Sequence, residues 1–439
     1  MRRWVFAAML APTLAWASAR TPLTNGIYLR PGDDHSLYVR TTFGLLISHD
    51  DGCSFRWVCE KALGYGGEFA PKYAIATDGT IFAATFTGLR ISRDGGCSWV
   101  TATAGPSDPD HLAEAWIDAI DIGPDGHVWL ATAESAKPNN LFESADNGAT
   151  FRPRGLFSRT VWYKSIRVAK SDPKRIYATG YQVAGEAKAH LYRSDDAGAT
   201  WHELPLADPI RYGGTPIVYV LGIDPTNPDV LYMTSGGASP PSGDRLYRSS
   251  DGGHSFREVL HTSDAVRDVV FRKASVMVAT LGSGSFEASD GVQFARLPGT
   301  TPQLACLAQK ADGSLVGCGA NWEPDNMALA TSATGAAWTK LFRFGELAGP
   351  LRCPAGTLAH DACAAQWPAL QQQFGAHAPT SCPAGSDLQV IPPPAPPAKP
   401  GSGCCDASGE LPSGAVVVGV IGMAFALRRR RYRASRQLG

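Results

Sequence analysis

The chain has 439 residues, with 40 basic and 40 acidic side chains and a formal net charge of zero at pH 7. Charged residues make up only 18% of it, while glycine (47) and proline (32) are abundant, and this mixture favours many short strands and turns over long helices. The missing basic excess argues against a nucleic-acid-binding protein.

The first 19 residues have the three parts of a secretory signal peptide. Arg2 and Arg3 give a positive start, residues 4–14 form a short apolar run, and Ala17-Ser18-Ala19 offers small residues for cleavage. The alternative is a membrane anchor, but the run is too short to span a bilayer. We therefore predict export, with residues 1–19 as the signal peptide.

An eight-residue pattern, S-x-D-x-G-x-[ST]-[FW], recurs five times and organises the next 300 or so residues. Two eroded copies follow, at about residue 288 and at Thr331. Successive copies start 40–55 residues apart, and each is preceded by short β-rich runs and Asp/Gly turns, which fits one four-stranded blade per copy. The aspartates of the intact copies are Asp50, Asp94, Asp146, Asp196 and Asp251.

The pattern has a physical logic as the turn between the third and fourth strands of a blade. The aspartate accepts hydrogen bonds from the backbone of its own turn, and the glycine takes the positive φ that the turn requires. The closing Phe or Trp packs beneath the turn. We therefore predict that the five aspartates stabilise turns and carry no chemistry.

The pattern resembles the Asp-box (BNR) repeat of β-propellers over about residues 21–345. That group includes sialidases, xyloglucanase-type glycoside hydrolases, sortilin-type receptor domains and a photosystem assembly factor. Residues 171–177 and 223–232 are most similar to the xyloglucanase and sortilin branch. The resemblance implies an all-β, seven-bladed propeller over residues 20–345, but not one activity, since function resides in sites added to folds.

Ligands of such propellers meet the loops that enter the first strand and leave the second strand of each blade. The acids on or near these loops are Glu68, Asp118, Glu186 and Glu323, and two of them facing each other would suit a glycoside hydrolase. The alternative is that all four are solvated loop acids. Arg159, Arg211 and Arg267 are the arginines that a sialidase-like carboxylate site would need, although the Phe-Arg-Ile-Pro motif of sialidases is absent.

Aromatic side chains on the same loops are candidates for stacking on a sugar or anchoring a protein partner. They are Tyr65, Phe69, Trp116, Trp162, Tyr163 and Trp322. For Trp162 and Trp322 the alternative is that they plug the central tunnel. Trp116 enters an apolar strand, so we expect it in the core.

Export makes the cysteines candidates for disulfides. Cys306 and Cys318 flank the turn at 310–313, so they would lie opposite each other on a hairpin. Cys53 and Cys59 form a second candidate pair, whereas Cys97 has no obvious partner. The connectivity of a third group stays open: Cys353, Cys363 and Cys382. The spacing of cysteines and histidines predicts no metal site, and nothing indicates a cofactor.

The remaining chain reads as an appendage and a tail. Residues 346–388 predict a small disulfide-tied appendage with a short helix, and residues 389–403 a polyproline spacer. Residues 404–439 hold Cys404 and Cys405, an apolar run barely long enough to span a membrane, and an arginine cluster. This tail resembles the myxobacterial C-terminal sorting signal, which implies processing at the cysteine motif. A simple membrane anchor is the alternative.

The sequence thus favours a non-enzymatic, surface-displayed propeller that binds a protein or a glycan. A glycoside hydrolase of the xyloglucanase-like or sialidase-like type and an assembly factor for an envelope complex remain alternatives. All three place the protein outside the cytoplasm, attached to the membrane through its tail.

Overall fold

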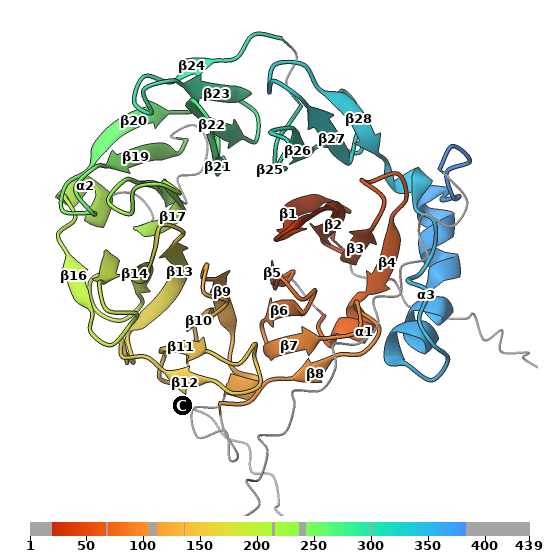
Figure 1. Ribbon diagram of the computed structural model, residues 1–439, viewed down its shortest axis with the longest axis horizontal. Coiled ribbons are helices and arrows are strands. Elements are labelled where there is room, and N and C mark those ends of the chain that lie inside the picture. Colours follow the sequence, from red (N-terminus) through yellow and green to blue (C-terminus); the bar gives the residue numbers. More distant parts are fainter. Residues whose placement is uncertain are drawn as a thin grey trace, which may run out of the picture. The chain divides into compact units, whose positions relative to one another are not determined.

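Seven four-stranded antiparallel sheets follow one another along the chain and form a ring, in which the first strand of each sheet lies innermost (Figure 1). The computed structural model describes residues 20–66, 69–104, 112–135, 137–212, 216–236, 243–299 and 302–382. The predicted all-β, seven-bladed propeller is therefore confirmed.

Each blade is built from four consecutive strands, so no strand from one end of the chain completes the sheet of the other end. Blades 1 and 2 comprise β1 (Thr24–Arg30), β2 (Asp33–Thr41), β3 (Gly44–Ser48), β4 (Arg56–Cys59), β5 (Lys72–Ile75), β6 (Ile81–Thr85), β7 (Gly88–Ser92) and β8 (Val100–Thr101). Blades 3 and 4 comprise β9 (Ile117–Ile122), β10 (Val128–Thr132), β11 (Leu141–Ser144), β12 (Arg152–Pro153), β13 (Val161–Ala169), β14 (Asp172–Gln182), β15 (Ala189–Ser194) and β16 (His202–Leu204).

The other three blades repeat this order. Their strands are β17 (Ile217–Ile223), β18 (Leu231–Gly236), β19 (Arg245–Ser249), β20 (Arg257–His261), β21 (Val266–Arg272), β22 (Ser275–Thr280), β23 (Ser285–Ala288), β24 (Ala295–Arg296), β25 (Cys306–Gln309), β26 (Leu315–Cys318), β27 (Leu329–Ser332) and β28 (Thr339–Phe342). Short helical elements lie between the blades and after them: α1 (Glu60–Leu63), η1 (Leu112–Glu114), α2 (Asp208–Arg211), η2 (Phe344–Glu346) and the longer α3 (Leu358–Phe374).

The position of a strand in its blade explains its composition. The second strands β6 and β10 are apolar and fully buried, because both faces of a blade pack against neighbouring blades. The outermost strands β8, β12 and β24 are only two residues long and largely exposed. Short outer strands leave few unpaired backbone groups at the rim, which limits edge-to-edge association.

The five repeated turns lie between the third and fourth strands, on one face of the ring. In the turn of blade 5, Asp251 accepts hydrogen bonds from the Ser255 N–H (2.9 Å) and hydroxyl (2.6 Å) and from the Ser249 hydroxyl (2.8 Å). Gly252 and Gly253 have φ values of 68° and 88°, which explains why small residues recur there. These local bonds account for the identity of the repeated aspartates.

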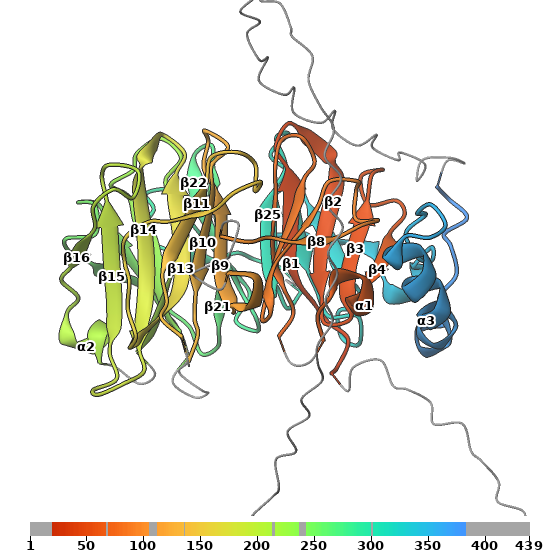
Figure 2. The same ribbon diagram turned by 90° about the horizontal axis from the view of Figure 1, so that it is seen from below.

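The segment after the last blade folds back onto the rim of blade 1. The Trp57 N–H donates to Gly349 (2.9 Å) and the Leu351 N–H donates to Trp57 (2.8 Å), so residues 349–351 run parallel to β4. Helix α3 packs over β4 and α1 (Figures 1 and 2). Thr357 caps the helix, which is longer than the short helix expected from the sequence and carries Pro368 inside it.

Three disulfides bond this segment to the first two blades: Cys53–Cys382, Cys59–Cys363 and Cys97–Cys353. The predicted pairing of Cys53 with Cys59 is therefore wrong. Cys53 lies shortly before β4 and Cys59 is its last residue, but each side chain meets the returning segment instead of the other. The hairpin bridge Cys306–Cys318 is confirmed, and these two residues are register partners in β25 and β26. We call residues 347–382 with their three bridges the clamp.

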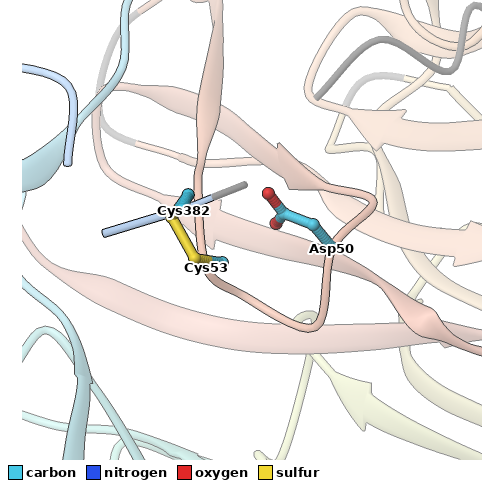
Figure 3. Close-up of side chains that lie close together, drawn as sticks. All are labelled: Asp50, Cys53 and Cys382. Carbon is cyan, nitrogen blue, oxygen red and sulfur yellow. A yellow bond between two sulfur atoms is a disulfide. The ribbon is translucent and has the colours of Figure 1, made fainter. Parts of the chain in front are cut away.

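Asp50, Cys53 and Cys382 gather at one end of the clamp (Figure 3). The two sulfur atoms are bonded to each other, and the Asp50 carboxylate accepts hydrogen bonds from Ser48 and Ser54. These bonds account for the cluster without a metal ion.

Several predictions fall outside the described residues. They are the signal peptide at 1–19, the end of the appendage at 383–388, the spacer at 389–403, the tail at 404–439 including Cys404 and Cys405, and Glu68. Within the described ranges, no helix has the length and apolar character needed to cross a membrane.

Candidate functional site

The connections of the ring divide between two faces, because neighbouring strands in a blade are antiparallel. The segments that link one blade to the next and the turns between second and third strands lie on one face, which we call the linker face. The repeated turns lie on the other face. Side views of the blades show the strands running between these faces (Figure 2).

Large apolar side chains are exposed mainly on the linker face. Of the eight such side chains among the described residues, six lie there: Phe69, Phe86, Phe157, Val183, Tyr212 and Trp322. The other two, Val100 and Leu358, lie on an outer strand and on α3. Grouped exposed apolar side chains mark interaction surfaces more often than scattered ones do.

Four of the aromatic rings on this face touch one another, and we call them the aromatic cluster. Phe69 and Phe86 stack at 5.6 Å between ring centroids, and each lies 5.2 Å from Trp116. Trp162 meets the edge of Trp116 at 5.8 Å. Phe69 and Phe86 are 50% and 48% exposed, so the cluster opens to solvent across blades 2 to 4.

A cavity of about 800 Å³ occupies the middle of the ring, lined by the innermost strands of all seven blades. Its cationic side chains are Arg40, Lys72, Lys164, Arg167 and Arg267, and its acidic side chains are Asp244 and Asp268. Both acids accept backbone N–H bonds, Asp244 from Val266 and Asp268 from Leu307. The cavity wall thus carries more positive than negative charge.

A charged triad connects the cavity to the aromatic cluster. Asp118 on β9 accepts hydrogen bonds from Lys72 on β5 (2.9 Å) and from Lys164 on β13. The Lys164 ammonium lies 5.1 Å from the centroid of the Trp116 ring, within the range of a cation–π contact. The three charged residues come from three neighbouring blades, so only the folded ring brings them together.

A second cavity of about 250 Å³ is lined by Trp322, which is 42% exposed, and by Arg40 and Arg267. The two candidates Trp322 and Arg267 are thus brought together, as the sequence could not show. Arg267 forms no hydrogen bond or ion pair with the described residues. Both arginines also line the central cavity, so the two spaces share a wall.

Burial raises the pKa values of two groups that line the central cavity. Burial raises the pKa of Asp268 to about 6, against the lowering effects of its backbone hydrogen bonds and of Arg167. Burial also raises the pKa of Tyr219 to about 12, with Asp118 raising it further and Arg267 lowering it. The Tyr219 hydroxyl is therefore influenced by the charges of both Asp118 and Arg267, of which Arg267 lines the cavity with it.

Three of the four predicted acids lie among the described residues, in three different settings. Asp118 is buried and bonded to two lysines, Glu186 is exposed in the β14–β15 loop, and Glu323 is exposed in the β26–β27 turn beside Asn326. No hydrogen bond joins any two of these three. Of the three arginines proposed for a carboxylate site, Arg267 alone lines a cavity, whereas Arg211 is paired with Glu203 and Arg159 lies over Phe157.

Two aromatic candidates are core residues. Tyr163 is buried and its hydroxyl donates to the Leu156 carbonyl, and Tyr65 is buried against the α1 region. The opposite correction applies to Trp116, which we expected in the core but which is only partly buried and joins the exposed rings. Residue type could not separate these cases, because Tyr65 lies after α1, Trp116 before β9 and Tyr163 inside β13, where the orientation of a side chain depends on the neighbouring blade.

Sequence reasoning missed Phe86, Lys72 and Lys164. Phe86 occupies a two-residue turn between β6 and β7, and an aromatic residue in so short a turn has no blade to pack into. An aromatic residue in so short a turn was therefore the indication, visible in the sequence, that Phe86 is exposed. Lys72 and Lys164 lie in strands whose other residues are mostly apolar. For Lys164, a charged residue inside such a run was the indication of a special role that the sequence offered.

No protein-family model matches the chain, and no curated protein matches it. Among solved structures, an ancestral GH74 enzyme is similar over 73% of this chain and 46% of its own, at 16% identity and a TM-score of 0.52. A GH74 enzyme from Niastella koreensis (15% identity, 75% and 66% covered, TM-score 0.42) and YCF48 from Cyanidioschyzon merolae (14%, 70% and 97%, 0.46) are also similar. The chain spans about half of the ancestral enzyme and about two thirds of the Niastella enzyme. These likenesses concern the fold.

Proposed function

We propose that this chain is an exported propeller of the Asp-box type, held at the cell surface by its C-terminal tail, that binds a protein or a glycan without chemical turnover. The observation that carries this proposal is the aromatic cluster, which exposes two phenylalanine rings on the linker face above a cationic cavity. Exposing such rings to water is unfavourable unless a ligand covers them.

A second feature of the cluster supports a ligand. The indole N–H of Trp162 is buried and has no hydrogen-bond partner among the described residues. A buried donor without a partner costs free energy, and a rearrangement of the cluster on binding would let this N–H find an acceptor. The disulfides of the clamp support export, because such bonds persist in oxidising compartments.

The test is binding by the full chain with and without the exposed rings. Phe69→Ala with Phe86→Ala should weaken binding to surface glycans or envelope proteins by at least tenfold, because aromatic anchors dominate such interfaces. The matched control is Val100→Ala, which removes an exposed apolar side chain from an outer strand instead. Equal binding by both variants would refute the proposal.

Hydrolysis of a polysaccharide is the alternative function, because the fold is similar to that of GH74 enzymes. It predicts that the purified protein releases reducing ends from polysaccharides, and that Asp118→Asn or Glu186→Gln abolishes the release. The engagement of Asp118 by Lys72 and Lys164 argues against it, since both glycosidase mechanisms use a pair of carboxyl groups. Turnover that depends on either acid would replace the binding proposal.

Attachment is tested separately. Removing residues 404–439 should release the protein into the medium, whereas the full chain should fractionate with the envelope and be accessible to added protease. A truncated chain that stays with the envelope would contradict anchoring by the tail.

A further inference from the structure

The triad of Lys72, Asp118 and Lys164 is unbalanced in charge. One carboxylate faces two ammonium groups, and the side chains of Lys164 and Asp118 are both only 10% exposed. A buried charge without a counter-charge is costly, so an anion bound beside these lysines would offset part of that cost. Lys72 holds its place by donating to both the carboxylate and the backbone carbonyl of Asp118.

Other charged groups facing this space do not remove the excess. Arg40 and Arg267 add positive charge, and the Arg40 Nε is buried without a hydrogen-bond partner among the described residues. The acids on the opposite wall, Asp244 and Asp268, are engaged by backbone N–H groups of β21 and β25. Lys164, whose side chain is 10% exposed, is therefore a nearly buried cation next to the aromatic cluster, and Lys72, 34% exposed, lies beside it on Asp118.

We propose that Lys72 and Lys164 form an anion-binding site that takes the carboxylate of an acidic peptide segment, whose neighbouring apolar side chain packs on the aromatic cluster. This inference rests on the proposed binding function and names its ligand class. The Lys164 ammonium lies 5.1 Å from the Trp116 ring, so one peptide segment reaches both features.

The geometry of the rings favours a peptide over a sugar chain. A sugar stacks one face on a flat ring, and its hydroxyl groups need polar partners around it. Here Trp116 is tilted by 39° and 44° to the two phenylalanine rings and by 65° to Trp162, so the rings form a compact mound. Apolar protein side chains pack against both edges and faces of such a mound.

The experiment compares a substitution that removes positive charge from the site with one that removes negative charge. A dodecamer peptide is selected from a random displayed library against the full chain, and its affinity is measured for the wild type and for variants. Lys164→Met removes one ammonium group and should weaken binding at least tenfold, whereas Lys164→Arg should keep most of it. Asp118→Asn removes the competing carboxylate and should strengthen binding severalfold.

A purely structural triad would respond differently, because both Lys164→Met and Asp118→Asn would then disturb the site and weaken binding. That result would overturn the proposal. The peptide carries its own control, since replacing its acidic residue by the amide should cost the wild type at least tenfold and the Lys164→Met variant almost nothing. Selected peptides that lack acidic residues would also overturn it.

Two further arms separate the alternatives. An oligogalacturonate that binds more tightly than every selected peptide, with the same dependence on Lys164, would overturn the assignment to a peptide. If Phe69→Ala with Phe86→Ala abolishes peptide binding while the lysine and Asp118 variants leave it unchanged, the binding function stands and the anion site falls. If neither set of variants matters, the proposed function itself fails.

Discussion

We predict that the three long-range disulfides of the clamp act together to hold the ring closed. Because every blade is complete in itself, no shared sheet joins blade 7 to blade 1. The seam between them is held by side-chain contacts such as Lys310 with Asp51 (2.6 Å), and by the covalent path through the clamp. We therefore expect the loss of all three bridges to lower the free energy of unfolding by more than the sum of the three single losses.

The magnitude follows from the loops that the bridges close. Alone, Cys59–Cys363 closes a loop with a sequence separation of 304, which the chain-entropy relation converts to about 6 kcal/mol. Once Cys59–Cys363 is formed, the shortest loop that Cys97–Cys353 closes has only about 50 residues, which corresponds to about 4 kcal/mol. The loop that Cys53–Cys382 then closes has about 25 residues, which corresponds to about 3.5 kcal/mol.

Removing one bridge while the other two remain should thus cost about 3.5–4 kcal/mol, but removing all three should cost about 13 kcal/mol. The sum of the three single effects is about 11 kcal/mol, so the triple loss exceeds it by about 2 kcal/mol. A cost of that size approaches the whole stability of most domains.

The assay is guanidinium unfolding, followed by tryptophan fluorescence, of variants in which paired cysteines are replaced by alanine. The matched control removes Cys306–Cys318, whose separation is 12 and whose loss should cost about 3 kcal/mol regardless of the other bridges. Adding reductant to the wild type should reproduce the effect of removing all bridges. The reasoning is refuted if the last clamp bridge to be removed costs no more than the first.

Two other predictions concern single acids. Asp251→Ala should cost roughly 1–2 kcal/mol by urea unfolding, because it removes three hydrogen bonds in an exposed turn, whereas Glu186→Ala should be neutral. Burial raises the pKa of Asp251, but bonds from Ser255 and Ser249 lower it to about 2, so its contribution is present above about pH 4 and lost towards pH 2. For Asp268, whose pKa rises to about 6, the sign is reversed: its contribution is present below about pH 4 and lost as the pH rises through 6, worth about 3 kcal/mol. Asp268→Asn should remove this loss between pH 4.5 and 7.5, and an unchanged pH profile would contradict the assignment.

The repeat explains how much of the fold could be predicted. The β-rich runs at 81–85 and 89–92 coincide with β6 and β7 to within a residue, because the turn before β7 and the repeated turn after it fix where pairing starts and stops. The first blade begins at Thr24, three residues before the β-rich run that starts at Ile27, and the polar Thr24 gives no sign of this in the sequence. Its hydroxyl donates to the Ala328 carbonyl (2.7 Å) of blade 7, a contact that no local pattern announces.

The clamp could not be predicted, for a physical reason. Cysteines close in sequence are expected to pair because the loop between them is short, and Cys53 and Cys59 met that expectation. Yet Cys59 is fully buried under α3, where Cys363 provides the partner. Partner choice there depends on the return of a segment some 300 residues later, which only the closed ring specifies.

The candidate site shows why repetition and function are separated in this chain. A residue that recurs in every blade makes equivalent local contacts in each, as Asp251 does with Ser249 and Ser255, so it cannot create a single asymmetric site. Lys72, Asp118 and Lys164 occupy different positions within their strands, the first of β5, the second of β9 and the fourth of β13. Their meeting therefore depends on the offset of three neighbouring blades around the ring axis. A constraint that holds the blades in their relative positions also holds this triad, so the proposed binding site depends on the rigidity of the ring.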